Sequence, residues 1–584
     1  MTIVLLLLVG VAGSAGSAWA LSRGGAIARA GALGGILALV LLAVLGGASG
    51  TPDPATIASG AASAWNGALV PNGYLRFVLV LAALDGIVLA GIASLLGGLV
   101  GLRALLPATL AVMTGTTVAL AAADPAIGAL GAAGAGLAAL PALLASPRTS
   151  TAATAAREIR VAVATAVVLV AAAGLAPVAA RLRLADPGGA VAAGSVPVAA
   201  IGLAVLATAV ALAARAGVIP FHVRISALTD VAPPVALPLL VAWIPLPFVV
   251  VSLTTVGNVL APLALPLDAE RGIIVAFTLV TLLAAALAAF IADDLRHATG
   301  YLVIADAGIV LLGIAALDPD AWGPARVWLV AMAASKTALA AWSAVAEDRF
   351  GTRSIPDLRG WAQSAPILAA ALVTIMAATF GLPGWLAFEA RGTLASLAAG
   401  GPWNALLVIA GFLTIPTYFR ILALGFGPPT SHVERAAPER VRSGGLPLRM
   451  PRRRARPVGL DIELEGSAVV PAGDAAPATT RSKRTASPVR VAATATVPTA
   501  AAAGSSPSDD ADATGTRTRT RRSVSAGSSL ADATAARIRR DRAELLSAGV
   551  LALALLASLV AWGVLDIGHV AAEPAPAAAG AGPD

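Results

Sequence analysis

Long apolar stretches, separated by short polar connections, fill most of this 584-residue chain. A helix needs about 20 predominantly apolar residues to cross the roughly 30 Å hydrocarbon core of a bilayer. By this rule about 14 stretches qualify, and one of them is interrupted. They lie at 2–21, 26–45, 77–100, 105–122, 127–145, 161–178, 191–218, 234–256, 273–291, 299–317, 327–345, 367–397 (the interrupted one), 403–424 and 545–565. The pattern predicts an all-α, polytopic membrane helix bundle.

One long segment, 428–543, lacks this pattern. It is rich in Ala, Pro, Ser, Thr and Arg and shows no apolar periodicity, which is typical of disorder. We therefore expect four parts in the chain. These are a membrane bundle at 1–427 with transmembrane helices one to thirteen, a disordered basic loop at 428–543, the last transmembrane helix at 544–566 and a disordered tail at 567–584.

Composition narrows the class. The chain is 58% hydrophobic and only 12% charged, whereas soluble domains carry about 25% charged residues. This excludes a soluble globular enzyme. Cysteine is absent and only four histidines occur, which argues against disulfides, Fe–S clusters and multi-histidine metal sites. We expect no metal site and no cofactor in this chain.

The net charge of +8 is unevenly placed. With the N-terminus outside the cell, arginines in the short loops favour the cytoplasmic side by roughly two to one. The long basic loop, which contains Arg452–Arg454 and Arg537–Arg542, then lies in the cytoplasm. A nucleic-acid-binding arm is the alternative interpretation, but we favour a topogenic loop attracted to anionic lipid and expect no nucleic-acid partner. The pattern is typical of a multi-pass membrane protein, and we expect its location to be the bacterial inner membrane.

Ionisable residues inside or beside the apolar stretches are the candidate functional groups, because burying a charge in a membrane is costly. Pro220 follows the end of one of these stretches and Pro383 interrupts another, and each proline must break or end a helix there. A broken helix beside a buried charge is a feature of ion-transporting folds. The candidates are Arg215, His222, Asp306, Lys336, Glu389 and Arg391.

Four motifs in this region occur in one order. They are Arg215–His222 followed by Ala232–Pro234, the segment from Asp293 through Tyr301 to Gly308, Ser335–Lys336, and Gly381–Gly384 followed by Phe388–Arg391. Together they resemble the antiporter-like proton-channel subunits of respiratory complex I (NADH:quinone oxidoreductase), which are related to multisubunit sodium/proton antiporter subunits. The resemblance covers 148–426 well and the earlier stretches by topology only.

The resemblance implies a fold of 14 helices with two inverted repeats, each containing one broken helix. It implies a proton-translocating subunit that packs against other membrane subunits and the lipid bilayer, with quinone handling left to neighbouring subunits. A cation/proton antiporter subunit and a non-conducting structural subunit of the same fold are the alternatives.

The chain also departs from the family pattern. By the family's spacing, Arg215 replaces the central lysine of the first repeat, and Arg391 replaces the terminal lysine or glutamate of the second. The expected glutamate of the first repeat falls at Gly136, and the next expected lysine or histidine falls near Pro245 or Pro247. A buried lysine can release a proton because desolvation lowers its pKa, whereas arginine effectively cannot. We therefore expect a first repeat without a counter-ion for Arg215 and without a proton carrier.

Each candidate has a simpler interpretation. Arg215 is either a fixed central charge or a side chain that snorkels to the surface. Asp306 either faces the bundle or caps a helix, and Glu389 either has its own role or pairs locally with Arg391. His222 suits a structural hydrogen bond at the break.

Lys336 has no charged neighbour in the sequence and is the strongest candidate for a proton site. Asp85 is isolated in its apolar stretch, and the sequence favours neither a functional nor a structural role for it. We expect Asp293, Asp294 and Arg296 to form a solvated inner loop.

Overall fold

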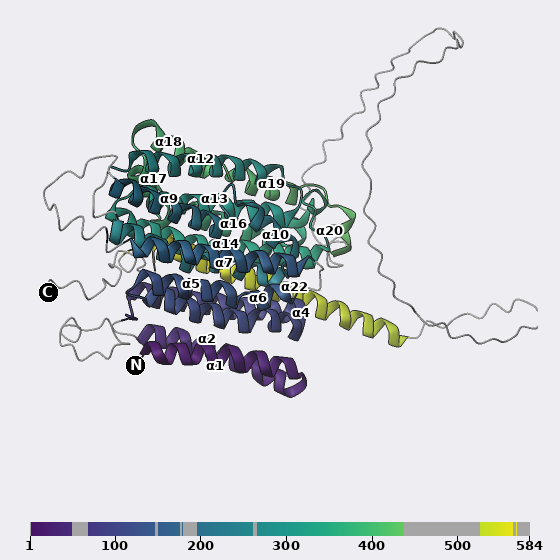
Figure 1. Ribbon diagram of the computed structural model, residues 1–584. Helices are drawn as coiled ribbons and strands as arrows, with labels where there is room; N and C mark the ends of the chain where they lie inside the picture. Colours follow the sequence, from purple (N-terminus) through teal and green to yellow (C-terminus); the bar gives the residue numbers. More distant parts are fainter. Residues whose placement is uncertain are drawn as a thin grey trace, which may run out of the picture. The chain divides into compact units, whose positions relative to one another are not determined.

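The computed structural model describes residues 2–48, 68–145, 150–175, 178, 196–260, 266–436, 526–564 and 568. These residues are almost entirely helical (Figure 1), and within them the only β pairing is two isolated bridges, Leu69 with Ala122 and Asp294 with Ser354. This confirms the expected all-α class.

The first set of helices lies between residues 2 and 260. They are α1 (Thr2–Arg23), α2 (Gly25–Ala48), α4 (Gly73–Ala121), α5 (Pro125–Ala138), α6 (Leu140–Leu144), α7 (Thr151–Gly174), α9 (Val196–Ala216), α10 (Val223–Val231), η1 (Pro234–Ala236), η2 (Leu239–Trp243), α11 (Pro245–Thr254) and η3 (Thr255–Leu260).

The second set of helices lies between residues 268 and 562. Its helices are α12 (Asp268–Ile291), α13 (Leu295–Ala315), η5 (Pro319–Ala321), α14 (Trp322–Phe350), η6 (Pro356–Leu358), α15 (Trp361–Ser364), α16 (Pro366–Phe380), α17 (Leu386–Ala398), α18 (Gly401–Phe412), α19 (Ile415–Gly425), α20 (Ser431–Ala436) and α22 (Ala526–Trp562).

Helix α4 is in fact two membrane-spanning helices. A straight helix of its 49 residues would be about 74 Å long. Its two ends nevertheless meet, because Val70 N–H donates to the Ala121 carbonyl at 2.7 Å and the Asn72 amide donates to the Leu120 carbonyl at 2.9 Å. The reversal occurs at Gly98, whose φ of 55° and ψ of −138° suit glycine alone.

The expected number of spans is confirmed once this hairpin is recognised. In the described residues, 11 helices are long and apolar enough to cross a membrane. Counting α4 as two spans, and adding α7 and the interrupted pair α16 and α17, brings the total to the fourteen expected from the sequence.

The two inverted repeats are also present. Five spans run from the second half of α4 to η3, and five more run from α12 to α19. In each group the fourth span is broken, at Pro220 between α9 and α10 and at Pro383 between α16 and α17. Because five is odd, the second group starts on the opposite side of the membrane from the first, which makes the repeats inverted.

Glycine brings the helices of the first repeat into close contact. A Cβ atom on Gly115 of α4 would lie 2.5 Å from the Ala135 backbone nitrogen, and one on Gly131 of α5 would lie 2.6 Å from that of Ala119. Small residues allow such approach in membranes, where dispersion and backbone proximity replace the hydrophobic effect between helices.

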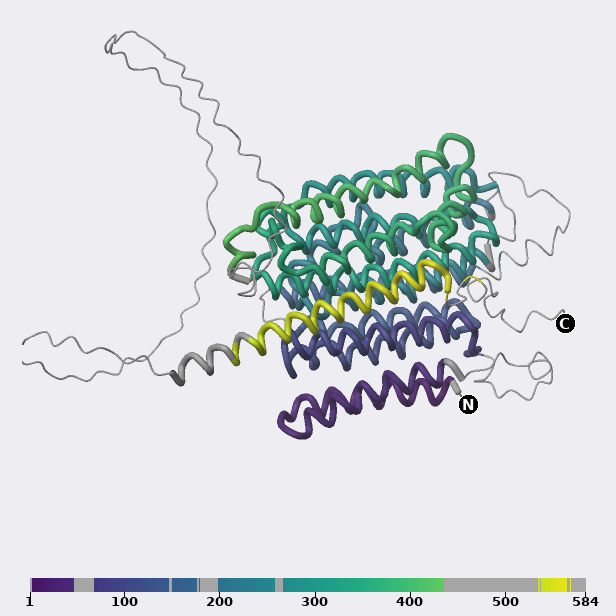
Figure 2. The backbone as a smooth tube through the Cα atoms, turned by 180° about the vertical axis from the view of Figure 1, so that it is seen from behind, coloured from purple at the N-terminus to yellow at the C-terminus, as the bar shows by residue number. Residues whose placement is uncertain are grey.

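The last helix, α22, crosses both halves of the bundle (Figure 2). In its second half Gly549 lies against Ile92 of α4, and beyond its end Gly563 lies against Leu386 of α17. Hydrogen bonds add to this packing, because Ser547 accepts one from Arg349 and Ser558 donates one to the Thr374 carbonyl. The helix therefore holds the first and second halves of the chain together.

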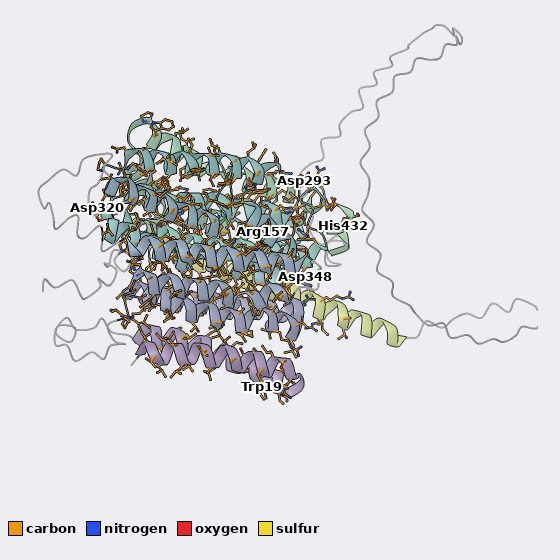
Figure 3. The ribbon with its side chains drawn as sticks, in the orientation of Figure 1. Trp19, Arg157, Asp293, Asp320, Asp348 and His432 are labelled. Carbon is orange, nitrogen blue, oxygen red and sulfur yellow. The ribbon has the colours of Figure 1, made fainter. Side chains whose placement is uncertain are left out.

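Charged side chains mark the two ends of the bundle. Figure 3 shows Asp320 at one end and Arg157, Asp293 and Asp348 at the other. At the margins of the expected disordered loop the structure has helix, namely α20 and the first part of α22. The remainder of that loop and nearly all of the expected tail lie outside the described residues.

Candidate functional site

Three charged side chains meet beside the first broken helix, and we call Glu158, Arg215 and Arg224 the first charge cluster. Arg215 Nη1 lies 3.2 Å from Glu158 Oε2, and Arg224 Nε lies 2.8 Å from Glu158 Oε1. All three side chains are at most 6% exposed. They come from α7, the last turn of α9 and the first turn of α10 respectively.

The first charge cluster corrects two expectations. Arg215 is 1% exposed, so it does not snorkel to the surface. Its counter-ion is not lost, because Glu158 supplies a carboxylate from α7. Position 136 does lack a carboxylate, and a Cβ on Gly136 would lie 2.3 Å from Arg215 Nη2. The guanidinium therefore occupies the space above Gly136, and it lies 4.7 Å from the centre of the Phe248 ring.

Sequence reasoning missed Glu158 because Arg157 and Arg160 lie beside it, a combination that is also typical of a charged loop before an apolar stretch. The helix actually begins at Thr151. Its buried side chains follow the helical period through positions 151, 154, 158, 162 and 165. That periodicity was the available signal that Glu158 faces inward.

The second cluster of buried charge joins Lys336 of α14 to Asp306 of α13. Lys336 Nζ lies 2.6 Å from Asp306 Oδ2, and the two side chains are 0% and 4% exposed. Asp306 therefore lies within a buried helix rather than at a cap. The Trp328 indole donates to the Asp306 backbone carbonyl at 3.2 Å, which provides a second link between α14 and α13.

Hydroxyl groups extend this pair towards the second broken helix. Lys336 Nζ donates to the Tyr418 hydroxyl at 3.4 Å, and that hydroxyl lies 3.4 Å from Thr379 Oγ1. Thr379 is the penultimate residue of α16, directly before the break. We call Asp306, Lys336, Tyr418 and Thr379 the second polar row. Sequence reasoning found neither Tyr418 nor Thr379, since single hydroxyls in apolar stretches are common.

Arg391 lies on the other side of the same break. Its Nη2 donates to the Phe380 carbonyl at 2.9 Å, and its guanidinium sits 3.9 Å from the centre of the Phe412 ring. No carboxylate lies within ion-pair distance of Arg391 among the described residues. It is a buried permanent charge that fixes the end of α16 to α17.

The structure does not bring the other two candidates into these clusters. Glu389 is exposed, and the expected local pair with Arg391 is wrong because no ion pair joins them. His222 is half-buried at the start of α10, and its Nδ1 has no hydrogen-bond partner in the described part of the chain. Asp85 is 1% exposed on α4, and its Oδ2 likewise lacks a partner there.

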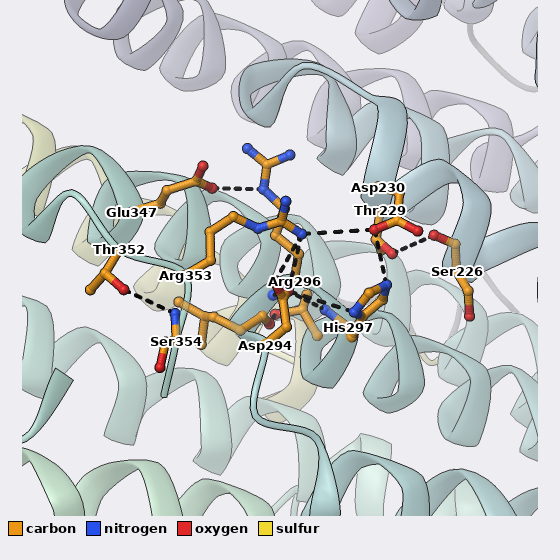
Figure 4. A network of polar contacts seen from close by, with 12 residues as sticks. Ser226, Thr229, Asp230, Asp294, Arg296, His297, Glu347, Thr352, Arg353 and Ser354 are labelled. Atoms are coloured by element: carbon orange, nitrogen blue, oxygen red, sulfur yellow. Dashed lines mark hydrogen bonds and ion pairs between the residues drawn. The ribbon is translucent and has the colours of Figure 1, made fainter. Parts of the chain in front are cut away.

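A polar network at the end of the bundle links the two repeats (Figure 4). His297 Nε2 lies 3.1 Å from Asp230 of α10, and Arg353 Nη2 lies 3.0 Å from Asp294, which caps α13. Arg296 is buried and pairs with Glu347 at 2.7 Å. The expectation of a solvated loop is therefore wrong for Arg296.

No group of three or more His, Cys, Asp or Glu residues that could hold a metal ion occurs in the residues described above. The clusters instead combine arginine, lysine, carboxylate and hydroxyl groups, which suit fixed charge and proton transfer.

Residues 129–415 match the family described as "NADH:quinone oxidoreductase/Mrp antiporter, TM". NADH-quinone oxidoreductase subunit N 2 of Syntrophobacter fumaroxidans is 30% identical over 141 residues, which are 24% of this chain and 29% of that protein. Subunit N of Hydrogenovibrio crunogenus is 25% identical over 216 residues, or 36% of this chain and 44% of that one. The chain thus spans less than half the length of each of these relatives.

Residues 129–415 of the chain belong to this antiporter-like family.

Solved structures support the antiporter-like fold. A chain of the Mrp complex from Dietzia sp. DQ12-45-1b has a TM-score of 0.54 at 19% identity, covering 72% of this chain and 81% of that one. A chain of the membrane-bound sulfane sulfur reductase, an archaeal respiratory complex, has a TM-score of 0.58 at 14% identity, covering 74% and 89%. A chain of respiratory complex I from Thermus thermophilus has a TM-score of 0.52 at 16% identity, covering 75% and 95%.

The antiporter-like chain therefore keeps the family fold while its two repeats differ in chemistry. The first charge cluster holds two arginines around one glutamate, whereas the second polar row holds a lysine, an aspartate and two hydroxyls. Of these two sets, only the second polar row contains a basic group that can give up its proton in a protein.

Proposed function

We propose that this chain is a proton-translocating membrane subunit of an NADH-quinone oxidoreductase-type complex. The observation that carries the proposal is the buried ion pair between Lys336 and Asp306, with 2.6 Å between Nζ and Oδ2. A proton moving between these groups converts the ion pair into two neutral groups, so the pair can hold or release a proton without leaving an isolated charge in the membrane.

The second polar row supplies the next step of the path. The Tyr418 hydroxyl can accept a hydrogen bond from Lys336 and donate one to Thr379, so it connects the titrating pair to the second helix break. Irregular backbone at membrane depth is tolerated where it lines a cavity or is buried in protein. Arg391, fixed by Phe380 and Phe412, then holds a constant positive charge beside this path.

The proposal extends to the setting of the subunit. We place it in the bacterial cell membrane with the N-terminus outside and the basic loop in the cytoplasm, on the basis of arginine placement. Other membrane subunits are its partners. Redox chemistry belongs to neighbouring subunits, because the chain contributes no cysteine ligand for an Fe–S cluster. The family resemblance favours neighbouring subunits for quinone handling as well.

Proton flux into vesicles, measured per assembled complex, tests the proposal. We expect Lys336→Gln and Asp306→Asn each to lower flux to background, because each removes one member of the titrating pair. Lys336→Arg keeps the charge but cannot release the proton, and it should also fail. Lys483→Arg changes the one other lysine of the chain and serves as the matched control, with wild-type flux.

Assembly is measured in the same membranes, since breaking a buried pair destabilises a protein by about 3–5 kcal/mol. The uncharged double variant Lys336→Gln/Asp306→Asn leaves no unpaired charge and addresses this difficulty. Normal flux in an assembled Lys336→Gln complex would refute the proposal.

A non-conducting structural subunit is the second candidate, and the permanent charges at Arg215 and Arg391 favour it. Background flux in the assembled wild type, with no change on replacing Lys336, would support that candidate. Flux that requires sodium would instead support a cation/proton antiporter subunit.

A further inference from the structure

The two guanidinium groups of the first charge cluster share one carboxylate. Arg224 donates to Glu158 Oε2 from Nη2 at 2.9 Å and from Nε at 3.1 Å, and Arg215 Nη1 donates to the same oxygen at 3.2 Å. The cluster therefore carries one surplus positive charge, and the carboxylate is held by both arginines at once. A carboxylate bound in this way stays ionised.

Arg224 also joins the two halves of the first broken helix. Its Nη1 donates to the Arg215 backbone carbonyl at 2.6 Å. This carbonyl lies in the last turn of α9, where Gly217 adopts a φ of 77° and Val218 N–H turns back to the Ala213 carbonyl. The Arg224 side chain, which belongs to α10, thus caps the end of α9 and also binds Glu158 of α7.

The described residues that contact Arg215 offer little that could carry a proton in place of the side chains missing from the first repeat. Gly136 has no side chain, and the Arg215 guanidinium fills the space above it. The ring of Phe248 lies against the same guanidinium. The arginines themselves do not deprotonate in proteins.

We propose that Arg224 and Glu158 are positioning residues that lock the first broken helix closed, while proton transfer proceeds in the repeat with the second polar row. The statement about where protons are transferred rests on the proposed function. The closed state of the first broken helix does not depend on that function. A closed break keeps water away from Arg215 and Ala216.

The absence of cysteine from the sequence makes the closed state measurable. Ala216 lies next to Arg215 and is 2% exposed. The variant Ala216→Cys carries a single thiol, whose labelling by a water-soluble maleimide is followed in membranes of the assembled complex. We expect Arg224→Gln, added to this variant, to raise the labelling rate at least tenfold. The double change Glu158→Gln/Arg224→Gln keeps the surplus charge at one and should have the same effect.

Arg271→Gln is the matched control. Arg271 also donates to carbonyls at a helix end, those of Ala315 and Ala316 at the end of α13, but it lies outside the first charge cluster. The labelling rate at position 216 should be unchanged by this substitution. Equal labelling rates with and without Arg224 would overturn the lock.

Flux measurements test the assignment of proton transfer to the second repeat. We expect Arg224→Gln to retain proton flux within twofold of the wild type, and that flux to stay sensitive to Lys336→Gln. Loss of flux in an assembled Arg224→Gln complex, comparable to the loss in Lys336→Gln, would show that the first charge cluster takes part in transfer and would overturn the inference. If the wild type passes no protons, the proposed function fails, and the labelling result still decides whether the break is locked.

Discussion

The missing side chain at Gly136 makes room for the buried arginine of the first repeat. The guanidinium of Arg215 reaches into that space, between the backbone of α5 and the ring of Phe248. Because Arg215 is also held by Glu158, it cannot move away from position 136 without weakening a buried ion pair. Positions 136, 158 and 215 therefore act as one unit.

This coupling predicts the effect of Gly136→Ala. We expect a loss of about 1–3 kcal/mol of stability, the usual cost of overpacking, and a smaller loss when Arg215→Lys is also present. Gly134→Ala on the same helix meets nothing within 4 Å and is the control, expected to be neutral or stabilising. Thermal denaturation of the purified protein in detergent measures both. Equal effects at 134 and 136 would contradict the coupling.

The Tyr418 hydroxyl is the next group with a testable role. Tyr418→Phe keeps the buried ring, which meets Phe380 edge-on at 5.6 Å, and removes only the link between Lys336 and Thr379. We expect flux to fall about tenfold or more, equivalent to about 1.4 kcal/mol on the barrier, at unchanged assembly. Tyr301→Phe is the matched control. Unchanged flux in Tyr418→Phe would show that protons reach Lys336 by another route.

Sequence reasoning located the individual charges better than their partners. Lys336 and Asp306 could be named because an ionisable residue in an apolar stretch is conspicuous. Their pairing could not, since it depends on how α13 packs against α14. The counter-ion Glu158 was missed for a related reason, because a helix start cannot be distinguished from a charged loop when arginines surround it.

At the scale of elements, Gly98 is the point on which the hairpin within α4 depends. The apolar pattern predicted two helices, 77–100 and 105–122, and the structure agrees about both. The reversal itself lies inside the first predicted stretch. It needs no polar loop residues, because glycine tolerates the required backbone angles.

Substitution at the reversal should show this dependence. We expect Gly98→Ala to destabilise the protein by about 1–3 kcal/mol, the cost of placing a Cβ in a backbone region that only glycine favours. Gly97→Ala, one residue earlier, has open space around it and no positive φ, and it should have little effect. Detergent extraction yield and melting temperature provide the readout. Similar melting temperatures for both variants would argue against a strained reversal.

For the whole molecule, the number of spans followed from the sequence, because hydrocarbon thickness sets the length of each apolar stretch. The inverted repeats were implied by the family resemblance. The sidedness of those spans is a proposal that labelling can check. We expect a cysteine introduced in place of Asp320 to react with an impermeant maleimide only from outside the cell. A cysteine in place of Arg157, at the opposite end in Figure 3, should react only from the cytoplasmic side. Reaction of both from one side would contradict the proposed orientation.

The path of α22 across the bundle also affects how the protein is made. About 90 residues separate α20 from α22 in the chain, and synthesis proceeds at about 5–20 residues per second. The thirteen earlier spans therefore emerge about 5–20 s before the helix that contacts α4, α14 and α16. During that interval the surface around Ile92 and Thr374 faces lipid. The small residues Gly549 and Ser558 let the late helix dock from within the membrane, without reopening contacts that the earlier spans have already formed.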